Sequence, residues 1–575
     1  MQTIDFIIIA LYIAGLVTIG MIFARSMSNA KEMFAAGGRS PWWLSGLSAF
    51  MTMFSAGTFV VWGGISYRFG MVGVAICLTL GISALLVGLF LAGHWKRQGA
   101  DSGAEFLEMR FGKSLVQFYT WLQGGIAIFT MGGAVYALSV IICALIPLSE
   151  GHLLADPMTG KLSVTLTSIF ICGIVVMISM TGGLWAVLMT DVLQFIILTA
   201  TTLMVGPLLL AKVGGLGAFI DKAPEGFFRP THGEFTWWFL AGWVLVHFFK
   251  IGGEWAYIQR FTCVPTGRDA RKAAYIFGAM YLISPFFWML PPMVYQVIDP
   301  AAPHEQAYVL ACQYVLPAGM MGLMIAAMSS ATASTATTLL NVYAGAFTTE
   351  VYRRLINPAA TDRQMVRMGR VMTLFLGVVT LAGALLIPRI GSYTGWILSV
   401  TGMLTGPIVL PTIWGLFSRR IGLGTAWGVT LVSAAAGILA KMGLGAGGWF
   451  AGVEWLAGAA RLAQINPRIT EIVVGTALPL LLLLIAELSL RDVHPGWLRL
   501  EERRRMKHAE QAVMPSRLPA RLCGWSVAGL AGVMAVLAVI DRKEAPILAV
   551  FAALLGLVGV SILVLTRDRT TATPG

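Results

Sequence analysis

A stretch past the middle of the chain carries hydroxyl side chains in otherwise apolar surroundings, and it reads MSSATASTATTLLN over residues 328–341. On a helix, Ala331, Ser334, Thr335 and Thr338 fall at i, i+3, i+4 and i+7 and share one face. Hydroxyls of Ser334 and Thr335, joined by carbonyls of an unwound helix, would form an uncharged oxygen cage for a hard cation such as Na+, loose enough to release it. The alternative is helix packing through small residues.

Ionisable residues inside apolar stretches form a second signal. Asp191 is a functional candidate on this ground, or else a residue that reaches the interface from near a helix end. Lys250 and Glu254 lie at i and i+4 in WWFLAGWVLVHFFKIGGEWAYIQRF. On a continuous helix they form an internal ion pair; otherwise one of them meets a charged solute, as a carboxylate at Lys250 or an amine at Glu254. Neighbouring side chains that could complete a solute site are Ser55, Thr58, Trp62, Trp255 and Tyr257.

The composition places these residues in a membrane. The chain has 575 residues, of which 57% are hydrophobic and 12% charged, against about 25% charged in soluble domains, and its mean hydropathy is +0.79. Apolar runs long enough to span a bilayer recur along it, and we count about fifteen. The net charge of +13 is explained by basic residues that flank spans rather than by nucleic acid. No enzyme motif is recognised.

Two spans carry helix-breaking glycines at matching positions. The second has Gly57 and Gly63-Gly64, and the seventh has Gly252-Gly253. Interrupted helices in corresponding places mark the binding site of inverted-repeat transporters. We therefore expect an all-α membrane protein with a five-plus-five inverted-repeat core. Its parts are a leading helix and loop (1–40), a first repeat (41–211), a second repeat (212–421), two further helices (422–490), a basic cytoplasmic loop (491–520) and two C-terminal helices with a tail (521–575).

The distribution of Lys and Arg sets the expected orientation. With the N-terminus outside, most of the 40 basic residues fall in cytoplasmic segments, as the positive-inside rule requires. We expect a multi-pass protein of the inner (plasma) membrane with its C-terminus in the cytoplasm. The loop sequence EERRRMKHAE (501–510) predicts a short cytoplasmic helix, either an orientation anchor or an anionic-lipid patch. A monomer is compatible with the sequence, which leaves the oligomeric state open.

Four motifs resemble the sodium:solute symporter family of sodium-coupled sugar, proline and pantothenate carriers. They are GLMIAAMSSATASTATTLLN (322–341), MTGGLWAVLMTDVLQ (180–194), SGAEFLEMRFG (102–112) and AYIQRFTCVPTGRDARKA (256–273). The resemblance covers roughly residues 1–490. It implies a Na+ site formed by the Ser334 and Thr335 hydroxyls with the carbonyls of Met51, Phe54 and Ala331. It also implies that Asp191 lies on the ion's route toward the cytoplasm.

The chain departs from both known solute patterns of this family. Sugar carriers have a Glu in the span matching 71–96 and a Lys in the span matching 271–297. Here the first of these spans has no carboxylate, and the second has Arg271 and Lys272 only at its cytoplasmic mouth. Proline carriers have an Asp where this chain has Met53. The function that the sequence predicts is sodium-coupled import of a small organic solute by alternating access. The alternatives are a proton-coupled carrier of the same fold and a transporter-like solute sensor.

Overall fold

The computed structural model describes residues 2–26, 38–100, 102–146, 152–156, 160, 162–179, 184–390, 393–444, 448–450, 453–507, 518–542 and 544–565. Within these ranges the regular elements are helices, with isolated bridges at Ala155–Leu162 and His232–Phe235, so the all-α prediction is confirmed. Eleven helices of the described chain are long and apolar enough to cross a membrane, and two shorter apolar helices, Thr3–Gly15 and Val164–Met177, join them. The expected turn at Thr181-Gly182-Gly183 lies outside the described residues.

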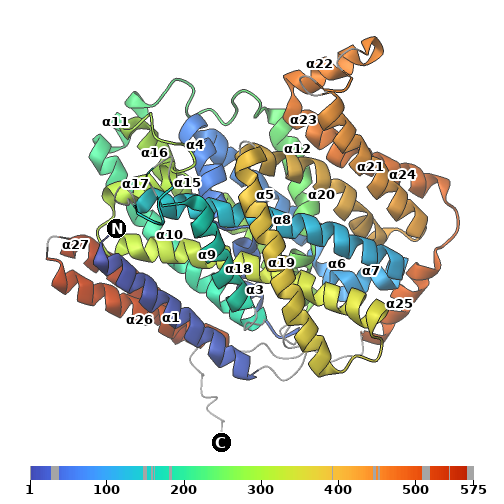
Figure 1. Ribbon diagram of the computed structural model, residues 1–575, viewed down its shortest axis with the longest axis horizontal. Coiled ribbons are helices and arrows are strands. Elements are labelled where there is room, and N and C mark those ends of the chain that lie inside the picture. The colour runs from blue at the N-terminus through green and yellow to red at the C-terminus, as the bar shows by residue number, and fades with distance from the viewer. Residues whose placement is uncertain are drawn as a thin grey trace, which may run out of the picture.

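The helices run through the chain in three groups (Figure 1). The first part contains α1 (Thr3–Ser26), α3 (Trp42–Thr52), η2 (Thr58–Trp62), α4 (Gly63–Phe69), α5 (Met71–Phe90), α6 (Ala92–Arg97), α7 (Gly103–Phe111), α8 (Lys113–Leu145), α9 (Val164–Ser179), α10 (Leu184–Val213) and α11 (Gly215–Lys222). The second contains α12 (Trp237–Gly253), α13 (Trp255–Thr262), α14 (Gly267–Ile283), α15 (Pro285–Trp288), α16 (Leu290–Ile298), α17 (Ala307–Val315), α18 (Met320–Phe347), η3 (Thr348–Ile356), α19 (Asp362–Ile390) and α20 (Tyr393–Phe417). The third contains α21 (Leu423–Gly443), η4 (Glu454–Leu456), α22 (Ala457–Ile465), α23 (Pro467–Ile472), η5 (Val473–Ala477), α24 (Leu478–Ser489), α25 (Pro495–Lys507), α26 (Leu518–Ile540) and α27 (Ala545–Leu565).

The first two groups pack against each other in a reciprocal way. Helix α3 of the first packs on α14 of the second, and α12 of the second packs on α5 of the first. In the same way, α8 of the first group packs on α19 of the second, and α18 of the second packs on α9 of the first. Each of these contacts therefore has a counterpart in which the two groups change places, as expected when two five-helix repeats are related by a pseudo-twofold axis.

Both predicted helix breaks are present. Helix α3 ends at Thr52, and helical structure resumes at Thr58 after an irregular segment. Helix α12 ends at Gly253, and Glu254 is extended (φ −73°, ψ 136°) before α13 begins at Trp255. The second break therefore falls at the residue after the Gly-Gly pair, not within it. Gly252 and Gly253 are required by close packing, since a Cβ at each would lie 2.3 Å from side-chain atoms of Leu91 and Val409, respectively.

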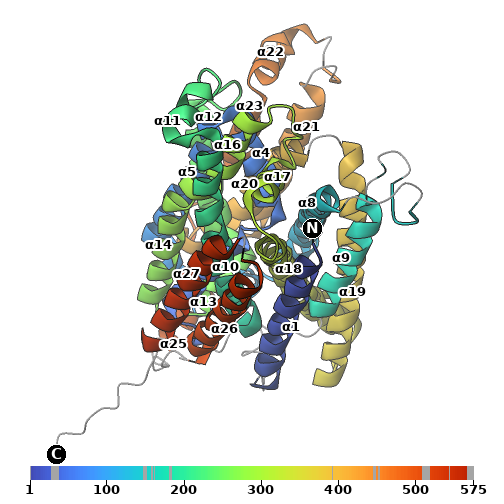
Figure 2. The same ribbon diagram turned by 90° about the vertical axis from the view of Figure 1, so that its left-hand side faces the viewer.

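The terminal helices α1, α26 and α27 lie on one side of this core (Figure 1). Helices α26 and α27 pair with each other and pack on α10, while α1 packs on α18 and α10; Figure 2 shows these three at the front. The α1 contact is specific, because Asp5 Oδ1 accepts hydrogen bonds from the N–H groups of Gly319 (2.7 Å) and Gly322 (2.9 Å). Asp5 thus caps the N-terminus of α18, the helix that carries the hydroxyl ladder.

A buried arginine joins α7 to the end of α20. Arg110 is fully buried, and its guanidinium donates to the carbonyls of Gly415 (3.1 Å), Ser418 (3.0 Å) and Ile421 (2.9 Å). These bonds satisfy the carbonyl of Gly415, in the last turn of α20, and two carbonyls of the connection between α20 and α21. The predicted basic helix is confirmed over residues 501–507 as part of α25, which packs beside α7.

Candidate functional site: a broken helix, a hydroxyl ladder and a cavity

Three of the five predicted Na+ ligands meet where α18 passes the break after α3. The Thr335 hydroxyl lies 3.0 Å from the Phe54 carbonyl oxygen and 3.0 Å from the Ala331 carbonyl oxygen. Phe54 belongs to the irregular segment, whereas Ala331 and Thr335 are one turn apart on α18. The arrangement gathers uncharged oxygens from two helices at one point, which is the type of donor that an alkali cation prefers.

The other two predicted ligands are engaged differently. The Ser334 hydroxyl donates to Asp191 Oδ1 at 2.6 Å, and the Met51 carbonyl accepts the N–H of Phe54 at 2.9 Å. Each oxygen still has lone pairs beyond the bond that it makes. In this structure Ser334 therefore links α18 to α10, and Met51 closes the turn that ends α3.

Asp191 is the centre of a buried network that joins four helices. Its Oδ2 accepts a bond from Ser48 of α3 at 2.5 Å. Arg260 of α13, also fully buried, donates to Ser48 Oγ (3.3 Å) and to Thr338 Oγ1 on α18 (3.2 Å). One Ser48 hydroxyl thus stands between a carboxylate and a guanidinium. Sequence reasoning singled out Asp191 but not Ser48 or Arg260, although Arg260 is part of the Gln-Arg motif.

Hydroxyl groups also satisfy the backbone of the first break. The N–H of Ser55 donates to Thr58 Oγ1 (3.2 Å), and the N–H of Gly57 donates to Ser55 Oγ (3.2 Å). The N–H of Ala56 donates to Thr332 Oγ1 on α18 (2.9 Å). Unpaired N–H groups are costly at membrane depth, so these three bonds explain how the chain tolerates the irregular segment. Ser55 and Thr58, predicted as solute ligands, line the cavity described next but also stabilise the break.

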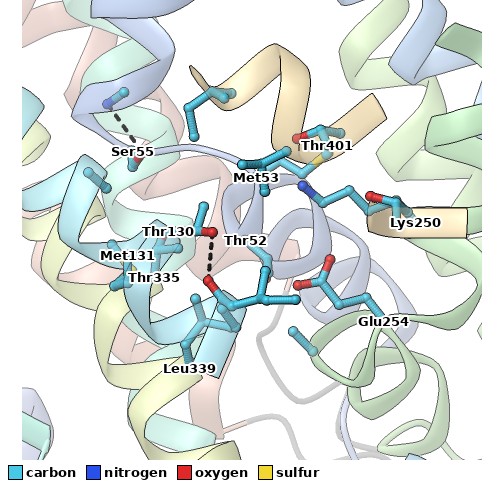
Figure 3. Close-up of a pocket in the computed structure, with 18 of the residues that line it drawn as sticks. Thr52, Met53, Ser55, Thr130, Met131, Lys250, Glu254, Thr335, Leu339 and Thr401 are labelled. Carbon is cyan, nitrogen blue, oxygen red and sulfur yellow. Dashed lines mark hydrogen bonds between the residues drawn. The ribbon is translucent and has the colours of Figure 1, made fainter. Parts of the chain in front are cut away.

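A cavity of about 230 Å³ lies between the two broken helices and helices α8, α18 and α20. Figure 3 shows Thr52, Met53, Thr130, Lys250, Glu254, Thr335 and Thr401 around it. Of the predicted solute-binding residues, the structure places Ser55, Thr58, Trp62, Lys250, Glu254 and Tyr257 in its wall. Thr335 belongs to both this wall and the oxygen cluster, so the two candidate sites adjoin.

Trp255 lies outside the lining of this cavity. Its ring stacks on Tyr343, with 5.8 Å between ring centroids, and covers Gly103, where a Cβ would lie 2.6 Å from the indole. The extended conformation of Glu254 changes the direction of the chain at this point. The residue after the break therefore faces α7 and α18 instead of the solute space.

Lys250 and Glu254 do not form the internal ion pair that a continuous helix would give. The break at Glu254 removes the helical i, i+4 geometry. Among the described residues, no Lys or Arg nitrogen lies within 4.0 Å of the Glu254 carboxylate, and no carboxylate lies within that distance of Lys250 Nζ. Figure 3 shows both side chains pointing into the cavity.

Gln123 is a cavity residue that the sequence only hinted at. It lies on α8 and is 5% exposed, and neither its amide nitrogen nor its amide oxygen has a hydrogen-bond partner among the residues that the structure describes. A buried primary amide without partners costs free energy, so a ligand is a natural partner for it. The signal in the sequence was its place in WLQGG, a polar residue within an apolar span.

Comparison with known proteins agrees with this architecture. The profile of the sodium:solute symporter family matches residues 33–431. The chain is 25% identical over 458 residues to the sodium/glucose cotransporter of Vibrio parahaemolyticus, covering 72% of this chain and 81% of that protein. It is 23% identical over 462 residues to the sodium/sialic acid symporter of Proteus mirabilis, covering 77% and 90%.

Solved structures share the fold. A substrate-bound, outward-open Na+-coupled sialic acid symporter superposes with a TM-score of 0.65 at 20% identity, covering 84% of this chain and 98% of that one. A nucleobase-cation-symport-1 family transporter in a closed conformation gives a TM-score of 0.51 at 15% identity, covering 83% and 99%. The chain belongs to the sodium:solute symporter family. It is a multi-pass membrane transporter that couples the movement of a small solute to Na+.

Proposed function

We propose that Na+ binds between the first helix break and α18 and holds the cavity in its solute-binding form. Its ligands are the carbonyls of Met51, Phe54 and Ala331 and the hydroxyls of Ser334 and Thr335. The observation that carries this proposal is the Thr335 hydroxyl, 3.0 Å from the carbonyls of both Phe54 and Ala331. A cation at this point is coordinated by both carbonyls and so links the irregular segment to α18.

The hydrogen bond to Asp191 leaves the Ser334 hydroxyl oxygen available as a Na+ ligand. A hydroxyl that donates its proton to a carboxylate keeps both lone pairs for a cation, and Ser334 donates to Asp191 at 2.6 Å. The carboxylate also provides a negative charge next to the ion without displacing a neutral ligand. Asp191 then forms the first step of the ion's route toward the cytoplasm.

The solute occupies the neighbouring cavity of about 230 Å³. We assign its contacts to Trp62, Lys250, Glu254 and Tyr257, with Ser55 and Thr58 shaping the break. Because Thr335 borders both sites, Na+ that orders Thr335 and the irregular segment also orders one wall of the solute site. That shared wall gives the two ligands a coupling free energy, which is reciprocal.

Transport follows by alternating access. The repeats, residues 41–211 and 212–421, rock about the fixed site, and the helices of 1–40, 422–490 and 521–575 surround them. The N-terminus lies outside and the C-terminus in the cytoplasm of the plasma membrane, with the basic segment 491–520 inside, and a monomer carries the complete pathway. The membrane potential contributes about 2.3 kcal/mol per charge for each 100 mV.

The test of the ion site needs no knowledge of the solute. Purified protein is titrated with Na+ at constant ionic strength against K+ or choline, with Trp fluorescence as the readout. We expect a saturable Na+-specific change that the Ser334→Ala/Thr335→Ala double variant loses. A double variant with unchanged sodium response would overturn the assignment.

A further inference from the structure

We propose that the solute is a zwitterion whose anionic group binds Lys250 and whose cationic group binds Glu254. This inference rests on the proposed function, because it assigns the chemistry of the same cavity. The juxtaposition that supports it is two opposite charges at one helix break, Lys250 in the last turn of α12 and Glu254 at the break itself, both facing the cavity (Figure 3).

The charges of Lys250 and Glu254 stay apart, whereas other charged side chains of opposite sign in this fold form ion pairs. Glu350 and Arg354 also stand at i and i+4, and they contact at 2.6 Å. The buried carboxylate of Glu471 contacts Arg468 at 3.1 Å and also pairs with Lys441. Lys250 and Glu254 have the same sequence spacing as Glu350 and Arg354, but no such contact within 4.0 Å is found for them in the described chain.

Among the described residues that line the cavity, Lys250 and Glu254 are the two charged side chains. The remaining wall is largely aliphatic, aromatic or hydroxylated, with His247 as a further titratable group. His247 Nδ1 lies 3.1 Å from the Trp243 carbonyl oxygen, so that nitrogen is engaged within its own helix. The wall therefore offers one charge of each sign to a solute.

A solute whose charges do not complement those of Lys250 and Glu254 binds with a free-energy penalty. In a cavity with a largely apolar wall an unpaired charge is unfavourable, and like charges across an interface cost several kcal/mol. A solute with only a carboxylate pairs with Lys250 but faces Glu254, and a solute with only an amine has the opposite difficulty. A neutral sugar leaves both charges without a partner. A zwitterion satisfies both, and the unpaired Gln123 amide can bind either end.

Size and lining restrict the body of the solute. A volume of about 230 Å³ is below the ~300–1,000 Å³ of drug-sized pockets. Apolar wall residues such as Leu339, Ile397 and Leu404 favour a compact, partly aliphatic skeleton. The class is thus a small amino acid or betaine.

The experiment screens solute pools against the purified full chain in saturating Na+ and, in parallel, in K+. The pools are the common amino acids with β-alanine, γ-aminobutyrate and glycine betaine; their desamino acids; their decarboxylated amines; and neutral sugars. Binding is measured by thermal shift and then by Trp-fluorescence titration. We expect at least one zwitterion to bind, and its desamino and decarboxylated analogues to bind at least about tenfold more weakly.

Charge variants separate a direct contact from a structural effect. Glu254→Gln should weaken the zwitterion but leave the desamino analogue unchanged or tighter, while Lys250→Met should weaken the desamino analogue as well. Glu234→Gln, at a partly exposed carboxylate outside the cavity, serves as the control and should change neither. A simple folding defect would lower affinity for all solutes alike and would not reverse their order.

The outcomes are distinguishable from failure of the proposed function. Zwitterion binding that is equal in Na+ and K+ supports the solute class and refutes sodium coupling at this site. The solute class is overturned, and the ion site retained, if the protein responds to Na+ but binds none of the zwitterions. The same conclusion follows if it binds sugars, or if it binds single-charge analogues as tightly as the zwitterions.

Discussion

The Thr335 hydroxyl lies 3.0 Å from the Phe54 carbonyl oxygen, although the two residues are 281 positions apart in the chain. This contact joins the irregular segment after α3 to the hydroxyl ladder of α18. In the proposed mechanism it is the place where Na+ inserts.

Replacement of Thr335 by Val keeps the shape of the side chain and removes its oxygen. We expect the half-saturating Na+ concentration to rise at least about tenfold, equivalent to about 1.4 kcal/mol, with the fold retained. Sodium titration by Trp fluorescence measures this change. Thr348→Val is the matched control, because the Thr348 hydroxyl, at the start of η3, bonds to the carbonyl of Ala344 four residues earlier at 2.7 Å. Equal effects of the two variants would contradict the assignment.

Asp191→Asn should leave Arg260 without its compensating charge. Loss of one partner from a buried charge network costs about 3–5 kcal/mol, so we expect a markedly lower thermal unfolding midpoint. Arg260→Met in the same chain should restore part of that stability, because it removes the orphaned charge. A double-mutant cycle of unfolding midpoints checks the coupling. Additive effects would show that the two charges act independently despite the Ser48 bridge.

Gln123→Leu should separate stability from solute binding. The amide of Gln123 is buried without a hydrogen-bond partner in the described part of the chain, so an apolar replacement of similar shape should leave the unfolding midpoint unchanged or higher. Solute affinity should nevertheless fall several-fold, because the replaced amide is a solute contact. Thermal unfolding with and without solute measures both quantities. A drop in stability with unchanged affinity would assign Gln123 a purely structural role.

Acidification should weaken the attachment of α25. Burial, with Arg110 and Arg499 nearby, lowers the pKa of His494 below its ordinary 6.5. Its Nδ1 lies 3.3 Å from Arg110 Nη1 and accepts the Gly496 N–H at 3.1 Å, so it must be unprotonated. The folded protein then binds fewer protons here than the unfolded chain, and this contribution to stability is present above pH 6.5 and lost as pH falls.

Hydrogen exchange of residues 495–507 between pH 7.5 and 5 measures this effect. We expect protection to fall with pH in the unaltered protein and to become nearly independent of pH in His494→Gln. Exchange in α8 provides the internal control. A pH response that survives the substitution would place the titrating group elsewhere.

The sequence predicted the all-helical fold and both breaks because glycine and polarity interrupt apolar periodicity in a recognisable way. It also predicted Phe54, Ala331 and Thr335 as neighbours, although Phe54 and Ala331 came from resemblance to a family. It missed Ser48 and Arg260 because their roles arise from contacts between distant helices. Trp255 was misjudged as a solute contact because the direction of a chain leaving a break depends on backbone angles that composition does not specify.

The hydrogen bonds that stabilise the first break form in a fixed order as the chain is synthesised. The bonds from Ser55 and Gly57 are made with residues at most three positions away, so they can form as soon as the second span leaves the ribosome. The bond from Ala56 needs Thr332, which is 276 residues later. Until α18 has been synthesised and inserted, that N–H must find water or lipid headgroups. Until then, the irregular segment of the newly inserted first repeat lacks one of the three hydrogen bonds that stabilise it.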